Sequence, residues 1–388
     1  MTDTIRQTTT IVDALQTLRD EALHQGRRIT ENGKGIDAHQ PHAERLAYLA
    51  TEVEAARALF AYAQDAQQHG EEDASEMALG FAAEVGHKIL GQADVHLTDF
   101  GFPESFLAET LGRNDVKAAI RVGAHESRFR QIGRRVIASR GVNNGWLESE
   151  IAVMTRDSVR QFARREVSPV AERVHRHDEL IPETIIQQMA ELGFFGMSVP
   201  EEYGGGGMGN LAMIITTEEL SCASLGVAGS LITRPEILTK ALLRGGTEAQ
   251  KQKWLPPIAA GKLMVAISVT EPDTGSDVAS VACRAEAATV GGKAGFLING
   301  AKAWCTFAGR ADIIALLART NPDLRSGARG VSLFIVEKDK FPGHSFEMRQ
   351  PTGGLLQGTA IPTLGYRGMH SYILNCENYF VPAENLVG

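Results

Sequence analysis

Hydroxyl-bearing side chains gather where an apolar run ends in the second half of the chain. The run is Met264–Val269, and the segment T-E-P-D-T-G-S-D at residues 270–277 follows it directly. An apolar run bounded by turn residues predicts a buried strand that opens into a loop. We expect Ser268, Thr270, Thr274 and Ser276 to cluster there. The glycine lets backbone N–H groups approach a ligand, so the loop suits a phosphate or a polar heterocycle. An ordinary strand and turn that bind nothing would have the same residues.

Bulk composition narrows the classes of function. The chain has 388 residues, of which 43% are hydrophobic, enough for packed cores in two or three domains. Its net charge is −8 without a block rich in Lys or Arg, which argues against nucleic acid as a main partner. No apolar run reaches the roughly 20 residues of a membrane span, and the polar N-terminus lacks a signal-peptide core. We therefore expect a cytoplasmic protein without a membrane partner.

Cysteines and histidines give no sign of a metal site. The four cysteines, Cys222, Cys283, Cys305 and Cys376, are widely spaced without a C-x-x-C pair, which fits free thiols in a reducing compartment. His175 and His177 are the closest histidine pair and lie in a charged stretch typical of a solvated helix end. The sequence therefore predicts no metal.

The first part of the chain reads as helices. Apolar residues recur at helical spacing over 11–23, 46–67, 76–97, 105–111 and 116–137, which predicts an antiparallel helical bundle. No chemistry is evident there, so a structural or interaction role is expected. Gly141–Gly145 predicts a flexible domain boundary. After it, 148–177 predicts a long amphipathic helix that Pro169 kinks or ends, and further helices follow to about residue 260.

Arg234-Pro235-Glu236 interrupts an otherwise apolar helical stretch. Charges there carry a cost unless they are paired or used. The two could be solvated at a surface turn, or they could pair with each other in a bend. The third alternative is that Arg234 binds a carboxylate of a ligand, because a guanidinium fork matches a carboxylate well.

From Met264 onward the pattern changes to strands separated by turns such as Gly291-Gly292-Lys293 and Asn299-Gly300. We expect strands over Val265–Thr270, Ser280–Ala287, Gly295–Thr306, Asp312–Arg319, Gly330–Glu337, Phe346–Arg349 and Asn375–Val381. Short strands at this spacing predict a compact β domain, barrel-like or sandwich-like.

Several motifs in order resemble the acyl-CoA dehydrogenase family. They are T-E-P-x-x-G-S-D after a strand, W-x-T at Trp304–Thr306, and G-T-E-x-Q-x-x-x-x-L-P at 246–256, and the match extends over 148–388. The resemblance implies a helical extension (1–145), an all-α acyl-CoA dehydrogenase N-terminal domain (146–263) and a β-barrel-like middle domain (264–388). It also implies that the family's C-terminal four-helix domain is absent from this chain.

The resemblance implies that FAD and an acyl-CoA thioester share the middle domain. Ile267, Val269 and Thr270 would then lie along the flavin ring. Trp304 would cover one flavin face, and Thr306 would reach N5. Ser276 would meet the flavin pyrophosphate or the CoA arm. Ile267 stands where the family often has an aromatic residue, and Phe307 where it often has a small or polar one, which suggests a tighter pocket.

The family's catalytic base is a glutamate that would fall beyond Gly388, so no base is assigned. Glu271 precedes a proline and is expected to fix its turn instead. The resemblance also implies electron-transfer flavoprotein as a partner, and a homodimer or homotetramer.

Within the family, the helical extension, residues 234–238 and residues 365–372 resemble the branch that oxidises (2S)-methylsuccinyl-CoA to mesaconyl-CoA in the ethylmalonyl-CoA pathway. That thioester has a free carboxylate, for which Arg234 is the first candidate partner and Arg367 the second. The alternatives are another short-chain or dicarboxylic acyl-CoA dehydrogenase, a flavin oxidase or monooxygenase of the same superfamily, and a non-catalytic module that binds flavin or a partner.

Overall fold

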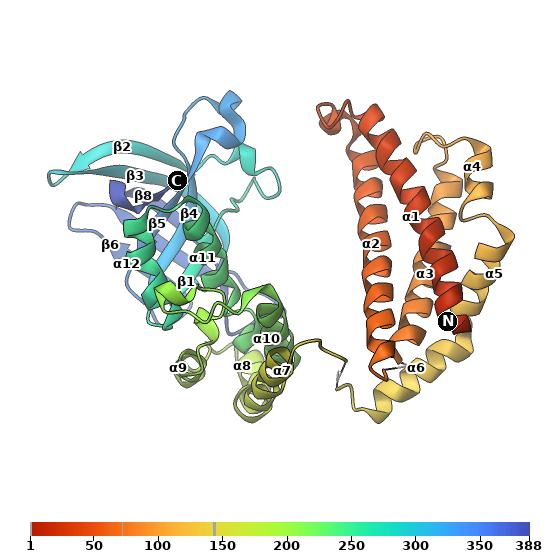
Figure 1. The fold of residues 1–388 in the computed structure, drawn as a ribbon. Helices are drawn as coiled ribbons and strands as arrows, with labels where there is room; N and C mark the ends of the chain where they lie inside the picture. Colours follow the sequence, from red (N-terminus) through yellow and green to blue (C-terminus); the bar gives the residue numbers. More distant parts are fainter. Residues whose placement is uncertain (1, 72, 143–144) are drawn as a thin grey trace. The chain divides into compact units, whose positions relative to one another are not determined.

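The computed structural model describes residues 2–71, 73–142 and 145–388. The chain divides into two compact units, Met1–Leu147 and Glu148–Gly388 (Figure 1). Asn143 and Asn144, in the predicted flexible break, lie outside the described residues.

The first unit is helical, as the apolar spacing predicts. Its α-helices are α1 (Asp3–Ile29), α2 (Gln40–Gln68), α3 (Asp73–Val95), α4 (Glu104–Glu109), α5 (Asn114–Gly123) and α6 (Glu126–Ala138), with a 3-10 turn at Ile36–His39 before α2. The single helix predicted over 116–137 is wrong, because the chain breaks at Ala124 and His125. The His125 side chain accepts the Ser127 N–H in the first turn of α6.

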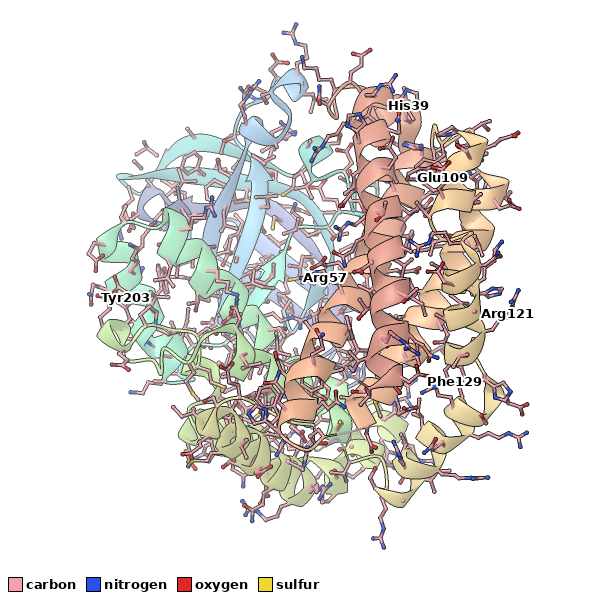
Figure 2. All side chains as sticks on the ribbon, turned by 45° about the vertical axis from the view of Figure 1, so that its right-hand side comes forward. His39, Arg57, Glu109, Arg121, Phe129 and Tyr203 are labelled. Carbon is pink, nitrogen blue, oxygen red and sulfur yellow. The ribbon has the colours of Figure 1, made fainter. Side chains whose placement is uncertain are left out.

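The core of this unit is a seam of apolar side chains at helical spacing. Ile11, Leu15 and Leu18 of α1 are fully buried, and they pack in one cluster with residues of α2, α3 and α5. Charged side chains such as Arg57 and Arg121 lie on the outside of the helices (Figure 2). This division of apolar and polar faces is what holds a helical bundle together in water.

The second unit begins with helices, and π-helical turns at Ala163–Val167 and Leu225–Gly229 interrupt their course. Its α-helices are α7 (Glu150–Phe162), α8 (Ser168–His177), α9 (Glu183–Glu191), α10 (Gly209–Ser224), α11 (Thr233–Gly245) and α12 (Glu248–Ala259). A π-helical turn at Ala163–Val167 separates α7 from α8, and Pro169 lies in the first turn of α8. The long helix predicted over 148–177 therefore changes course just before Pro169.

The stretch Gly209–Gly229 is long and apolar enough to cross a membrane by length and composition. The prediction that no segment reaches that length is therefore wrong. Half of this stretch is buried inside the unit. Its Glu219 forms a buried ion pair with Arg160 of α7, with a closest N–O distance of 2.7 Å. Packing within the unit accounts for its apolar character.

The strands form one nine-stranded sheet in the order β6-β7-β8-β3-β2-β4-β5-β9, with β1 paired to β4. Their bounds are β1 Val265–Ser268, β2 Arg284–Val290, β3 Lys293–Thr306, β4 Ile313–Arg319, β5 Val331–Glu337, β6 Ser345–Arg349, β7 Leu355–Ala360, β8 Ser371–Pro382 and β9 Leu386–Val387. The sheet folds over on itself, since the Tyr379 hydroxyl of β8 donates to the Glu337 carbonyl of β5 at 2.9 Å. This agrees with the predicted barrel-like domain.

The predicted set of strands lacks β7 and the short β9, and one predicted turn is wrong. Strand β7 was not predicted, because Leu355–Ala360 lacks an alternating pattern and contains a glycine. Asn299-Gly300, predicted as a turn, lies inside β3 at a shift in its register with β8. A bulge uses the same residue types as a turn, so local sequence does not separate the two.

A buried ion pair joins the segment after β1 to the middle of β3. Lys302 is fully buried, and its Nζ donates to Glu271 Oε1 at 2.8 Å and to the Val269 carbonyl at 3.0 Å. The Glu271 carboxylate also accepts the N–H groups of Ala282 and Cys283 at 2.8 and 2.9 Å. Burial alone would raise the pKa of Glu271, but these hydrogen bonds outweigh it and hold the pKa below its ordinary value.

We predict that Lys302→Met destabilises the second unit by about 3–5 kcal/mol, because it leaves the Glu271 carboxylate buried without its cation. Adding Glu271→Gln should restore part of that loss. The matched control is Lys253→Met, which breaks the half-exposed pair with Glu337 and should cost less than about 1 kcal/mol. Urea unfolding followed by tryptophan fluorescence measures the difference. Equal losses for the two lysine variants would contradict the prediction.

The lowered pKa of Glu271 makes its contribution to stability depend on pH. The contribution is fully present above the ordinary pKa of 4.5 and is lost as pH falls through the lower folded-state pKa. The stability gap between wild type and Glu271→Gln should therefore narrow from pH 7 toward pH 3. Urea midpoints at several pH values test this, and a gap that stays constant would show that the carboxylate does not titrate as expected.

Candidate functional site

A cleft of about 390 Å³ lies between α11 and the strands β1 and β3. Five of the residues predicted to hold a flavin line it, and so does Arg234. The lining residues are Thr233, Arg234, Ile237, Ile267, Val269, Thr270, Ala303, Trp304 and Thr306. Residues from three separate stretches of the chain therefore meet at one place.

The segment Val269–Thr270 is fixed against β3 by backbone contacts as well as by the buried ion pair. The Ala303 N–H donates to the Thr270 carbonyl at 2.8 Å, and Lys302 bonds the carbonyl of Val269. Glu271 closes the turn that follows, because its N–H donates to the Thr274 carbonyl at 2.8 Å. Glu271 therefore fixes this turn, as predicted, and its buried, paired carboxylate is no free base.

Trp304 faces outward because β3 carries a bulge. The register of β3 with β8 shifts between Lys302 and Cys305, and Trp304 takes a positive φ of 59°. Its two neighbours on either side are buried, whereas Trp304 is 56% exposed. A bulge of this kind re-aims a side chain out of the strand, and here it presents an indole to the cleft.

The hydroxyl of Thr306 is held by a residue distant in sequence. Thr306 Oγ1 and Ser371 Oγ share a hydrogen bond of 2.8 Å, and the next N–H, of Phe307, donates to the His370 carbonyl at 2.8 Å. The Phe307 ring is buried in the core of the unit. Cys305, between Trp304 and Thr306, is fully buried, and burial raises the pKa of its thiol to about 12, so it is no nucleophile for the cleft.

Arg234 lies in the first turn of α11 and is partly buried. One of its nitrogens, Nη1, donates to the Ser230 carbonyl at 2.9 Å and to Thr233 Oγ1 at 2.7 Å. Glu236 pairs with Lys240 at 2.7 Å, so the alternative in which Arg234 and Glu236 pair with each other is wrong. Within the described part of the chain, no carboxylate lies within ion-pair distance of Arg234.

Three residues singled out in the sequence lie elsewhere. Ser276 is exposed in the loop beyond the turn and does not line the cleft. Ser268 is fully buried, because alternation along β1 turns it toward the core. Arg367 donates to the carbonyls of Thr363 and His175 and lies 3.3 Å from Asp178 Oδ1, also outside the lining. The four hydroxyls therefore do not form one cluster.

Sequence reasoning missed some members of the site. Thr233 and Ile237 line the cleft beside Arg234, and their spacing on α11 is the helical i, i+3, i+4 pattern that could have identified them. Ser371 could not have been found locally, because it meets Thr306 only through the pairing of β3 with β8.

The lining suits a flat heterocycle with a polar rim. Ile267 and Val269 supply an apolar wall, Trp304 supplies an exposed aromatic face, and the threonines supply hydroxyls at the edge. A buried, preset hydroxyl such as that of Thr306 can bond one ring atom without moving. The residues present therefore fit a ring such as an isoalloxazine.

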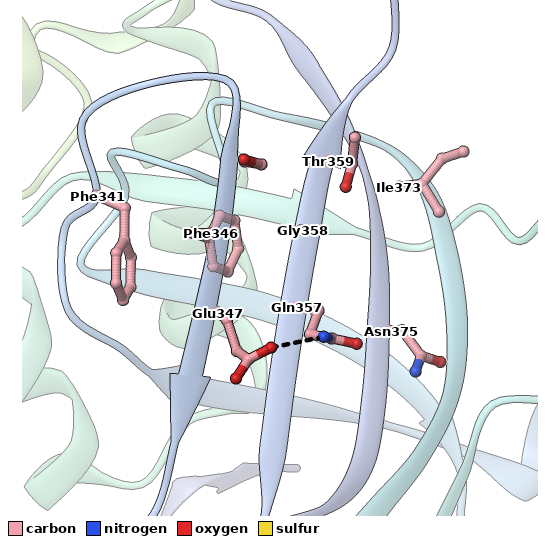
Figure 3. Close-up of a pocket in the computed structure, with 9 residues that line it drawn as sticks. Phe341, Phe346, Glu347, Gln357, Gly358, Thr359, Ile373 and Asn375 are labelled. Atoms are coloured by element: carbon pink, nitrogen blue, oxygen red, sulfur yellow. Dashed lines mark hydrogen bonds between the residues drawn. The ribbon is translucent and has the colours of Figure 1, made fainter.

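A larger hollow of about 690 Å³ lies on the sheet over β6, β7 and β8 (Figure 3). Two of its polar side chains bond each other, since Gln357 Nε2 donates to Glu347 Oε2 at 2.8 Å. It contains none of the residues predicted to bind a ligand, so we assign the site to the smaller cleft.

Two family models match the second unit. Residues 149–262 match the acyl-CoA dehydrogenase N-terminal domain, and residues 266–378 match the acyl-CoA dehydrogenase middle domain.

Individual relatives agree with these models. The chain is 36% identical to (2S)-methylsuccinyl-CoA dehydrogenase of Cereibacter sphaeroides over 97% of its own length and 68% of the relative's. Its fold matches that of glutaryl-coenzyme A dehydrogenase in complex with glutaryl-CoA at a TM-score of 0.52 and 32% identity, covering 63% of this chain and 57% of that one. A chain described as electron transferring flavoprotein of Acidaminococcus fermentans matches at a TM-score of 0.53 and 29% identity, with 64% and 60% covered.

The chain spans between half and about two thirds of the length of these relatives and of others such as the isovaleryl-CoA dehydrogenase of Arabidopsis thaliana. The two domain models, in order, coincide with the helices and sheet that build the cleft. The chain therefore belongs to the acyl-CoA dehydrogenase family, whose members are flavoproteins and oxidoreductases that act on CH–CH bonds.

Proposed function

We propose that this chain forms the flavin- and thioester-binding part of an FAD-dependent dehydrogenase for a short, branched, dicarboxylic acyl-CoA. The favoured substrate is (2S)-methylsuccinyl-CoA, with mesaconyl-CoA as product, as in the ethylmalonyl-CoA pathway. The observation that carries the proposal is the cleft in which the predicted flavin residues meet Arg234.

The cleft residues bind different parts of the flavin ring. Ile267, Val269 and Thr270 hold one edge of the ring system, and Trp304 covers a face and excludes water. Thr306, preset by Ser371, directs its hydroxyl to the reactive edge. Ile267, Val269, Thr270, Trp304 and Thr306 would hold the flavin, which would supply a hydride acceptor beside the β-carbon of the thioester. Removal of the α-proton would need a carboxylate base. We assign that base to no residue of this chain.

The preference for a dicarboxylic thioester rests on Arg234. The Arg234 guanidinium is partly buried, and only its Nη1 is engaged, so its other N–H groups can bond a carboxylate. Partial burial of an unpaired charge has a cost in free energy, which favours a role in ligand binding. Two relatives act on or bind dicarboxylic monothioesters by their names, methylsuccinyl-CoA and glutaryl-CoA. Arg367, the second candidate, is engaged with Asp178 and two carbonyls, which favours Arg234.

We also propose an electron-accepting partner, an oligomeric state and a cellular compartment. Electron-transfer flavoprotein would reoxidise the flavin, in keeping with the similarity to a chain described as electron transferring flavoprotein. A homodimer or homotetramer in the cytoplasm completes the proposal.

Anaerobic bleaching of flavin absorbance tests the function. The polypeptide, as its source organism makes it, is loaded with FAD and mixed separately with (2S)-methylsuccinyl-CoA, glutaryl-CoA and butyryl-CoA. Bleaching is expected with methylsuccinyl-CoA and weaker or absent with butyryl-CoA. Bleaching by butyryl-CoA alone would overturn the dicarboxylic assignment, and failure to retain flavin would support the non-catalytic module instead.

Arg234→Leu should lower kcat/KM for methylsuccinyl-CoA about 10- to 100-fold. A hydrogen bond to a charged group contributes about 1.5–3 kcal/mol, and about 1.4 kcal/mol corresponds to a factor of ten. The value for butyryl-CoA, which lacks the carboxylate, should change less than about threefold. Lys240→Leu on the same helix is the matched control, because Lys240 is exposed and outside the lining. Equal losses for both substrates would refute a role in carboxylate binding.

A further inference from the structure

Two histidines and an aspartate meet beyond the C-terminal end of α8, in a group that the proposed function does not use. Asp178 caps α8, His344 precedes β6, and His370 precedes β8. Their ligand-type atoms, one from each side chain, all lie within 4.8 Å of one another. His370 is buried, Asp178 is partly buried and His344 is exposed.

His370 has an oxygen acceptor at each ring nitrogen. Nδ1 lies 3.4 Å from the Gly368 carbonyl, and Nε2 lies 3.1 Å from Asp178 Oδ1. A neutral imidazole has a single N–H and can donate to only one of these two oxygens. The lone pair of its other nitrogen would face an oxygen lone pair, unless a proton or a metal cation lies between the two atoms. An Nδ1–H on a backbone carbonyl with Nε2 on a metal is the usual arrangement of a metal-binding histidine.

Backbone hydrogen bonds hold the segments that carry the two histidines, and the His344 carbonyl accepts the Ala360 N–H at 2.7 Å. The His370 carbonyl accepts the Phe307 N–H at 2.8 Å, and the Gly368 carbonyl accepts the Ile181 N–H at 3.4 Å. Both Asp178 and His370 have left-handed backbone conformations, with φ of 55° and 47°. Asp178 and His370 are therefore set in place by the fold, while the exposed ring of His344 is free to adjust.

We propose that Asp178, His344 and His370 bind one divalent transition-metal ion, for which Zn²⁺ is the best match. Two imidazoles and a carboxylate are ligands that zinc prefers, and bonds of about 2.0–2.2 Å place tetrahedral ligand atoms about 3.4 Å apart. His370 Nε2 and Asp178 Oδ1, at 3.1 Å, are already near that spacing. The ring of His344, with its centroid 4.4 Å from that of His370, closes the group by a small rotation.

Arg367 lowers the affinity of the site for a metal ion. Its Nε lies 3.3 Å from Asp178 Oδ1, so a bound cation must share that carboxylate with a guanidinium. The guanidinium stays bonded when the carboxylate turns away, because it also donates to the carbonyls of Thr363 and His175. We therefore expect a micromolar Kd rather than the tighter binding of zinc sites without a nearby cation.

Such an ion would cross-link three stretches of the second unit. One of them leads directly into Ser371, whose hydroxyl bonds Thr306 in the cleft. The role of the ion is structural, because its ligands lie outside the cleft lining. The sequence predicted no metal site, since its three ligands lie in separate stretches of the chain and show no ligand spacing.

The test is a Zn²⁺ titration of the full chain, stripped with a chelator and assayed against a colorimetric zinc indicator. Wild type should bind one ion per chain with a micromolar Kd and unfold at a higher Tm when saturated. His344→Asn should weaken binding at least tenfold without changing the Tm of the metal-free chain, because His344 is exposed. His177→Asn, an exposed histidine next to Asp178, is the matched control and should bind as wild type does.

Cobalt distinguishes this site from a thiol. Co²⁺ bound by two imidazoles and a carboxylate should lack the strong near-ultraviolet band of a cobalt thiolate, and Cys222→Ser should leave binding unchanged. The proposal fails if wild type binds neither ion below millimolar concentration, if His344→Asn binds like wild type, or if Cys222→Ser abolishes binding. His344→Asn keeps the test decisive because the loss of an exposed side chain leaves the fold intact, and no outcome depends on flavin content.

Discussion

The geometry of the cleft depends on the buried ion pair of Lys302 and Glu271. Lys302 belongs to β3 and Glu271 to the turn after β1, so their 2.8 Å contact sets the distance between the two segments that hold the ring-binding residues. Val269 and Thr270 lie just before Glu271, and Ala303 and Trp304 lie just after Lys302. Apolar packing could bury the same surface, but a charge pair with two backbone donors allows a much narrower range of arrangements.

A second buried lysine, Lys338, directly follows β5 and shows what the carboxylate provides. Lys338 donates to the carbonyls of Gly309 and Ala311 at 3.0 and 2.9 Å. Neutral carbonyls compensate less of the desolvation, so burial lowers the pKa of Lys338 to about 8. Lys302 is more deeply buried but has a full negative charge beside it. Of these two lysines, the one with a carboxylate partner is therefore the one beside the cleft, where position matters for binding.

Local sequence was sufficient for most of the elements, whereas the residues of the cleft were assigned through the resemblance to a family. Strands β1 and β3 and the turn between Thr270 and Thr274 follow from apolar runs and turn residues, so Ile267, Val269 and Thr270 could be placed together. What local sequence could not predict depends on pairing between distant segments. The bulge at Trp304 and the bond from Ser371 to Thr306 arise from the register of β3 with β8. Glu236 pairs with Lys240, one helical turn away, and not with Arg234. Arg234 therefore lines the cleft without a carboxylate partner from Glu236.

The left-handed backbone of Trp304 has a consequence for how this chain would respond to selection. A residue with a β-carbon held at a φ of 59° carries about 1–2 kcal/mol of strain. Glycine or asparagine would relieve that strain, and it would also remove the indole from the cleft. Directed evolution for heat resistance alone would therefore select glycine or asparagine at position 304, and ligand binding would weaken. A screen that also demands retention of the bound ring would be needed to keep the tryptophan.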